Sequence, residues 1–301
     1  MKHLNQSAFD ASSRYILNNA RYLEKLIFGH HYIGPCPEKI VKAIKMYQNK
    51  DGGFGNALEP DFRMPYSSPM ATSVALRLLS QFKSTDGAEE SIVKAIHYLE
   101  HTFDAKIMGW ESVGKAVNLF PHAPWWKYHE PQDKMHGNPS AELVGYLIEF
   151  SGHVKHLDVE SIKEVYIQYF LDLKAFEEHE VFAFIRLYNK LSDIERVSLV
   201  PQLKQAYTLL VSLDSSKWDD YVPYPLKFIM LTEDDIFEID DVVLKKNVNF
   251  LIDKIHENGC VLPTWSWGAY HEDWEIAKRE WSGILTLDAL LVFERFHTLI
   301  V

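Results

Sequence analysis

Two tyrosine-histidine-glutamate triplets, at residues 128–130 and 270–272, are the groups in this sequence best suited to proton transfer. Histidine titrates near neutral pH, and an adjacent carboxylate can orient the imidazole or share its proton, so the pair suits general acid–base catalysis. The chain contains 15 tyrosines and 14 histidines, so a chance recurrence in two ordinary loops is the alternative. The triplets predict catalytic roles for His129, Glu130, His271 and Glu272.

A further group of polar residues follows a glycine-rich turn and contains Asn56, Glu59, Asp61, Arg63 and Tyr66. In one interpretation Asp61 is a catalytic acid or base that Arg63 orients, and Glu59, Arg63 and Tyr66 bind the substrate. In the other interpretation Asp61 and Arg63 form a loop ion pair, because such pairs are common and usually structural.

All eight tryptophans are expected in loops between helices. Trp125 and Trp126 are consecutive, and exposed tryptophans need a ligand, a partner or another loop to cover them. Trp265 and Trp267 alternate along an extended stretch, which places them on one side of it. These four residues predict the wall of an aromatic-lined cavity that the polar groups share. Its other binding residues are Trp110, Trp218, Tyr270 and Trp274, and its other catalytic residue is Asp220.

Helices must position these loops, because apolar residues recur three and four positions apart along most of the chain. Alternating strand patterns with hairpin turns are missing, so the sequence predicts an all-α fold. The periodicity predicts about eleven helices. They cover residues 12–28, 69–82, 139–150, 161–170, 181–191, 201–213, 244–256 and 282–299, with others opening near residues 38, 90 and 226.

The helices follow a repeat in which residues 38–44 are nearly repeated at 90–96. Each copy leads to a glycine and an aromatic residue, and then to a helix start at Ser68-Pro69 or Asn138-Pro139. Both starts have the form of an N-cap followed by proline at the first helical position. Uneven loops and an apolar last helix favour a closed ring over an open superhelix. The sequence therefore predicts a single domain over residues 1–301, an (α/α)-toroid of about five to six helix pairs.

The first glycine-aromatic segment, Gln48-Asn49-Lys50-Asp51-Gly52-Gly53-Phe54-Gly55, resembles the QW motif of the terpenoid cyclase and protein prenyltransferase superfamily. Its Asp-Gly-Gly part suits a turn that ends a helix, with Gly52 or Gly53 at positive φ. Residues 281–290 are similar to the inner-helix ends of the same superfamily. The resemblance implies the toroid fold and a small-molecule enzyme with an aromatic-lined central cavity.

The catalytic motifs of that superfamily are missing from the sequence, since Asp219-Asp220 and Asp234-Asp235 lack the spacing of the cyclase acid. The resemblance therefore supports the fold more than the activity. Aromatic walls that stabilise carbocations favour an isoprenoid substrate. Loop tryptophans mixed with histidine and carboxylates favour a sugar, on which two carboxylates would serve as acid and base in a hydrolase or lyase. A non-catalytic protein that binds a ligand or partner is the third alternative.

Composition limits the partners and the location. The net charge is −11 and no basic run occurs, which argues against a nucleic-acid partner. No apolar stretch is long enough for a membrane span, and residues 1–19 lack the apolar core of a secretory signal, so a cytoplasmic protein is expected. Cys36 and Cys260 stand apart from clusters of other ligands, so no metal site is expected. The sequence indicates no particular cofactor.

Overall fold

The computed structural model describes residues 1–299, and within them the chain forms twelve α-helices and four short 3-10 helices without a β-strand. The predicted all-α class is confirmed. The α-helices are α1 Gln6–Asn19, α2 Tyr22–Tyr32, α3 Pro37–Lys45, α4 Pro69–Gln81, α5 Ala88–Thr102, α6 Ser140–Glu149, α7 Val159–Asp172, α8 Glu178–Tyr188, α9 Asp193–Leu210, α10 Pro225–Ile229, α11 Asp241–Asn258 and α12 His271–Arg295. The 3-10 helices are η1 Lys115–Leu119, η2 Pro124–Trp126, η3 Ser151–His153 and η4 Ser215–Lys217.

The contacts between Cα atoms divide the chain into two compact units. Unit 1 contains Met1–Ala43, Ser212–Met230 and the chain from Glu238 onward, and unit 2 contains Ile44–Val211 and Leu231–Phe237. The expectation of a single domain stays a prediction.

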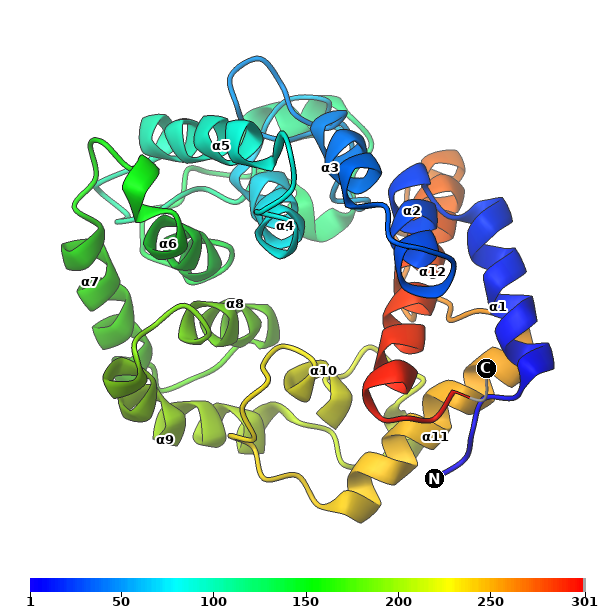
Figure 1. Cartoon of the computed structure of the whole chain (residues 1–301). Coiled ribbons are helices and arrows are strands. Elements are labelled where there is room, and N and C mark those ends of the chain that lie inside the picture. The colour runs from blue at the N-terminus through cyan, green and yellow to red at the C-terminus, as the bar shows by residue number, and fades with distance from the viewer. Residues whose placement is uncertain (300–301) are drawn as a thin grey trace. The chain divides into compact units, whose positions relative to one another are not determined.

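In unit 1, α1 packs against α2, α11 and α12, and α10 packs against α11 (Figure 1). Apolar faces of these helices form one core with Leu4, which precedes α1; it includes Ile16, Val248, Ile252, Leu290 and Phe293. In unit 2, α6 packs against α4, α7 and α8, and α9 covers α7 and α8 (Figure 1). The long loops between α3 and α4 and between α5 and α6 belong to this second unit.

Several predicted helix boundaries are wrong, each for a local reason. The single helix predicted over 12–28 is divided into α1 and α2, because Ala20 and Arg21 are extended. The Asn138-Pro139 peptide bond is cis and α6 begins only at Ser140, so Asn138 is not an N-cap. By contrast, the start predicted at Ser68-Pro69 is confirmed, because the Ser68 hydroxyl accepts the Ala71 N–H at 3.1 Å.

Two later helices begin earlier than the periodicity predicts. The helix predicted to start at Pro201 starts at Asp193, where Ser192 and Glu195 form a capping box, so the proline lies inside α9. The last helix begins at His271 instead of Ser282 and ends at Arg295. Two acidic residues in its first turn complement the helix dipole there.

The same hydroxyl bridge occurs in two helix pairs, α3 with α4 and α11 with α12. The Thr72 hydroxyl of α4 donates to the Ser68 carbonyl at 2.8 Å and accepts the Phe54 N–H at 3.0 Å. The Thr286 hydroxyl of α12 donates to the Ser282 carbonyl at 2.6 Å and accepts the N–H of Val261 at 2.9 Å. In each pair, the chain leaving the first helix is thereby fixed to the second. The helical repeat is thus visible in hydrogen bonds as well as in sequence.

The QW-like segment follows α3 and forms a turn that attaches the end of this helix to α5. Gly52 has a φ of 92°, which confirms the predicted left-handed position. The prediction that this turn ends a helix is wrong, because α3 already ends at Lys45 and the Asp51-Gly52-Gly53 turn follows it as a separate element. The Gln48 amide donates to the carbonyls of Gly52 and Ser91, both at 2.9 Å, and accepts the Ser91 hydroxyl at 2.9 Å. Phe54 is fully buried beneath the turn. The glutamine and the glycines therefore connect the helix pair α3–α4 to the helix pair α5–α6.

A buried carboxylate connects α4, α6 and α8, which lie side by side (Figure 1). Glu142 accepts two hydrogen bonds from Arg77, at 2.8 and 2.7 Å, and one from the Tyr146 hydroxyl at 3.0 Å. Arg186 lies 3.4 Å from the same carboxylate. Burial opposes ionisation of Glu142, but the charges of Arg186 and Arg77 outweigh it and hold the pKa of this carboxyl below its ordinary value.

A second carboxylate of α6 repeats this arrangement near the end of the helix. Glu149 lies 2.8 Å from the ammonium group of Lys83 and 2.7 Å from that of Lys190, and it accepts the Ser80 hydroxyl at 2.7 Å. We call the two arrangements around Glu142 and Glu149 the charge ladder. It fixes three helices of unit 2 by directional bonds in addition to apolar packing.

Candidate active site

The loops at 56–66 and 110–139, both in unit 2, lie side by side and are joined by backbone hydrogen bonds. The Asp61 carbonyl accepts the Ala123 N–H at 2.7 Å, and the Arg63 N–H donates to the Pro121 carbonyl at 2.8 Å. The Phe62 ring contacts the Trp126 ring edge to face, with centroids 5.7 Å apart. The structure thus joins the loop of the polar group to the loop that carries the first triplet, although no residue of 56–66 lines the pocket of that triplet.

The carboxylates of the 56–66 loop are turned into unit 2. Glu59 and Asp61 are buried, and the Glu59 carboxylate accepts the Asp61 N–H at 3.1 Å. Glu59 also interacts electrostatically with Arg77 of the charge ladder. The Arg63 guanidinium donates to the Pro60 carbonyl at 3.4 Å. These contacts give Glu59 and Arg63 structural partners within the loop and its supporting helices.

The 110–139 loop forms an open pocket of about 260 Å³, which we call the Trp125 pocket. It is lined by Glu111, Ser112, Val113, Trp125, Trp126, Lys127, Tyr128, His129, Glu130 and Gln132. The Trp125 side chain is 50% exposed. The indole N–H of Trp126 is shielded from solvent and has no acceptor within the part of the chain that the structure describes. The predicted residues Trp125, Trp126, His129 and Glu130 therefore share one concavity.

Two carboxylates of this pocket act electrostatically on the Tyr128 phenol. Its hydroxyl lies 3.4 Å from a Glu111 carboxylate oxygen, which also accepts the Gln132 N–H at 3.0 Å. Partial desolvation and the negative charges of Glu111 and Glu130 raise the pKa of Tyr128. The phenol consequently stays protonated and can donate a hydrogen bond at neutral pH. Glu111 was missed in the sequence, where the only signal was its position directly after Trp110.

Trp110 lies in the core of unit 2 and not at the pocket surface. It is fully buried, its indole N–H donates to the Leu99 carbonyl at 2.8 Å, and its ring contacts Phe103. Its backbone N–H also donates to the Ser140 hydroxyl at 3.1 Å. Trp110 thus joins α5 to α6 and supports the loop that carries the pocket.

Apart from Tyr66, which is in unit 2, the remaining predicted site residues belong to unit 1. Trp274 and Trp281 lie within α12, so the prediction that every tryptophan is in a loop is wrong. Trp267 is buried against Trp274, with ring centroids 5.8 Å apart, and Trp265 contacts Trp281 at 5.2 Å. Positions 274 and 281 are two turns apart on one helix face, so the aromatic segment before α12 packs along that face.

The second triplet has a different local structure from the first. Tyr270 has a φ of 49° and precedes α12, whereas His271 and Glu272 are exposed in the first turn of this helix. Trp218 is buried, and its indole N–H donates to the Ser212 carbonyl at 2.8 Å. Asp220 is exposed after η4. The expected meeting of these residues with those of unit 2 around one cavity stays a prediction.

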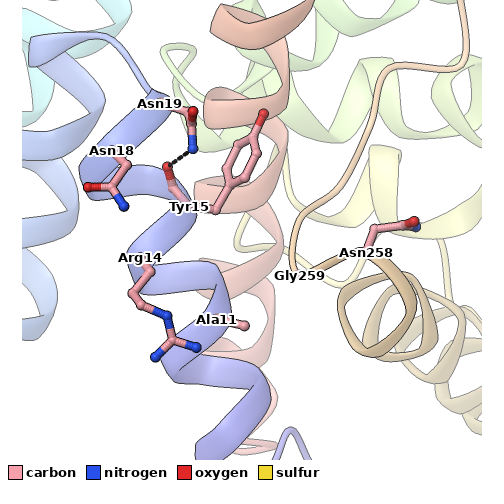
Figure 2. Close-up of a pocket in the computed structure, with 7 residues that line it drawn as sticks. All are labelled: Ala11, Arg14, Tyr15, Asn18, Asn19, Asn258 and Gly259. Atoms are coloured by element: carbon pink, nitrogen blue, oxygen red, sulfur yellow. Dashed lines mark hydrogen bonds between the residues drawn. The ribbon is translucent and has the colours of Figure 1, made fainter.

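A second pocket, in unit 1, contains none of the predicted site residues. It has a volume of about 320 Å³ and is lined by Ala11, Arg14, Tyr15, Asn18, Asn19, Asn258 and Gly259. These residues lie on α1 and at the end of α11 (Figure 2). The Asn19 amide donates to the Tyr15 carbonyl at 3.1 Å (Figure 2). Burial raises the pKa of Tyr15, although a hydrogen bond with Ser282 opposes the rise. The pocket is open, and most of its lining is exposed.

Across residues 1–299, no cluster of three histidine, cysteine, aspartate or glutamate side chains is placed to hold a metal ion. Within the same residues, no helix combines the length and the apolar character needed to cross a membrane. Comparison of the chain with protein-family models, curated proteins and solved structures returned no match.

Proposed function

We propose that this chain is a carbohydrate-active protein that binds a sugar in the Trp125 pocket, on a fold whose helix pairs close into an α/α toroid. The observation that carries the functional proposal is the composition of this pocket. A half-exposed tryptophan stands beside two carboxylates, a tyrosine and a histidine. An indole face can stack on the C–H face of a pyranose, while the polar groups bond its hydroxyls.

The same lining favours a sugar over an isoprenoid. An isoprenoid needs an enclosed, mostly apolar cavity, because each buried methylene of the ligand contributes about 0.8 kcal/mol only when water is excluded. The Trp125 pocket is open and contains Glu111, Lys127, His129, Glu130 and Gln132.

The toroid part of the proposal rests on the recurring helix pairs and on the QW-like turn. The bridges at Thr72 and Thr286 give two pairs the same internal connection. Such repeats bury their apolar faces only by stacking on neighbouring repeats. Small-angle scattering of the whole chain tests the closure, because an open superhelix of the same helices would have a larger radius of gyration.

Replacing Trp125 with alanine should weaken sugar binding about tenfold, since one stacking platform contributes on the order of 1–2 kcal/mol. The thermal midpoint should change little, because the side chain is half exposed. Calorimetric titration with oligosaccharides measures the affinity, and Trp125→Phe is the matched control that retains an aromatic face. Binding of prenyl diphosphates in place of every sugar would favour the isoprenoid alternative.

Glu111 and Glu130 are the proposed acid and base, because glycoside hydrolysis uses two carboxylates on opposite sides of the scissile bond. Glu111→Gln and Glu130→Gln should each abolish the release of reducing ends from a cleaved oligosaccharide while leaving its binding within a few-fold of wild type. A glutamine at position 111 still accepts the Gln132 N–H, so the loop should keep its conformation. If the wild type binds oligosaccharides but cleaves none of them, the chain is a sugar-binding protein and not an enzyme.

A further inference from the structure

A second aromatic surface is present on the same loops, at Tyr66. Its side chain is 57% exposed, although its ring rests edge to face on Phe120 with centroids 5.7 Å apart. Phe120 follows η1, whose last residue, Leu119, is also exposed. A single exposed tyrosine is ordinary, but the contact with a second ring restrains the orientation of this exposed side chain.

The backbone under Tyr66 is held in place. The Pro65 carbonyl accepts hydrogen bonds from the Asn49 amide at 3.0 Å and from the Asn56 N–H at 3.3 Å. Gly55 approaches the Tyr66 carbonyl so closely that a side chain at position 55 would collide with it. Tyr66 is thereby presented by a rigid loop, and a rigid aromatic contact costs little conformational entropy on binding.

The segment that supports Tyr66 is joined to the wall of the Trp125 pocket. The Asn118 side chain donates to the Tyr128 carbonyl at 2.7 Å and accepts the Tyr128 N–H at 3.0 Å. Asn118 is two residues from Phe120, the support of Tyr66, so at most about 7 Å of chain separates this clamp from the support. The platform at Tyr66 and the pocket wall at Tyr128 are therefore fixed to each other through a single short segment.

We infer that the ligand of this site is a chain of sugar residues long enough to contact Trp125 and Tyr66 together, and not a single sugar or a disaccharide. This inference rests on the proposed function. The open pocket lets such a chain continue beyond it, and the two aromatic faces supply separate stacking sites. The site accordingly suits an internal segment of a linear polysaccharide.

The test is the dependence of affinity on ligand length, measured by calorimetry with di- to hexasaccharides of the cello, malto, xylo, chito and galacturonate series. For at least one series, wild-type affinity should rise tenfold or more from the disaccharide to the hexasaccharide. Tyr66→Ala should abolish the rise and leave disaccharide affinity unchanged. Tyr66→Phe should restore the rise, because stacking needs the ring and not the hydroxyl.

Tyr22→Ala is the matched control, since this tyrosine is 59% exposed on α2 in the other unit and should leave every affinity unchanged. Two outcomes overturn this inference and leave the proposed function standing. In one, the wild type binds disaccharide and hexasaccharide equally well; in the other, the Tyr66→Ala variant keeps the full rise in affinity. A wild type that binds no member of the five series overturns the proposed function and this inference with it.

Discussion

Replacement of Glu142 with alanine is expected to lower the free energy of unfolding by about 3 kcal/mol. The Glu142 side chain is 3% exposed, and Arg77, Arg186 and Tyr146 all direct polar groups at it. Its removal leaves two guanidinium groups close together without the carboxylate between them. Their N–H donors then lack an acceptor, which costs free energy in a buried site. The arginines keep partial contact with water, which places the expected loss at the low end of the range for buried pairs. Urea unfolding followed by circular dichroism measures the change.

The matched control is Glu90→Ala, which removes a carboxylate that also contacts two cations, Lys45 and Lys94. The Glu90 side chain is 57% exposed, so solvent screens both interactions and the unfolding midpoint should stay close to wild type. If the variants at positions 90 and 142 lost the same stability, burial of Glu142 would not strengthen the charge ladder, and this prediction would be wrong.

The helices were predictable where local sequence determines them. Ser68 and Pro69 supply both a side-chain cap and a preset φ, so the start of α4 could be read to the residue. Asn138-Pro139 has the same appearance in sequence, yet its peptide bond is cis and no cap forms. The isomer of that bond depends on the surrounding packing, which the two residues alone do not reveal.

The charge ladder could not be predicted, because its members are far apart in the sequence. Arg77, Glu142 and Arg186 each occupy an ordinary position in an amphipathic helix. Only the packing of α4, α6 and α8 makes them partners. A charged residue in a helix is usually solvated, so sequence alone favours the wrong environment for Glu142.

The candidate site could be predicted only where its residues are close together in the sequence. Trp125, Trp126, His129 and Glu130 are near neighbours in the chain, and they line one pocket. Glu111 joins them only because the loop turns back on itself, with Gln132 bonded to its carboxylate. In unit 1, the sequence predicts a loop around Trp274, because the tryptophans and charges of this segment obscure the helical period of α12.

Replacement of Gly52 with alanine is expected to destabilise the chain by about 3 kcal/mol, through two separate effects. The φ of 92° disfavours any residue with a Cβ, which costs roughly 1–2 kcal/mol. The new methyl group would also lie far inside van der Waals contact with the Lys94 carbonyl oxygen of α5, and 2.9 Å from the carbonyl carbon. Relief of that collision requires the turn to move away from α5, which adds a comparable overpacking cost. Chemical unfolding of the variant measures the sum.

Gly87→Ala separates the two effects, because Gly87 also has a positive φ, 80°, but the nearest atom to its added Cβ is the Lys45 ammonium nitrogen at 3.7 Å. This variant should lose only the conformational part, roughly 1 kcal/mol. The difference between the two variants therefore measures how tightly the QW-like turn is seated on α5. If both glycines lost the same stability, the close approach to Lys94 would have no energetic consequence, and the Gln48 hydrogen bonds would account for the attachment of this turn to α5.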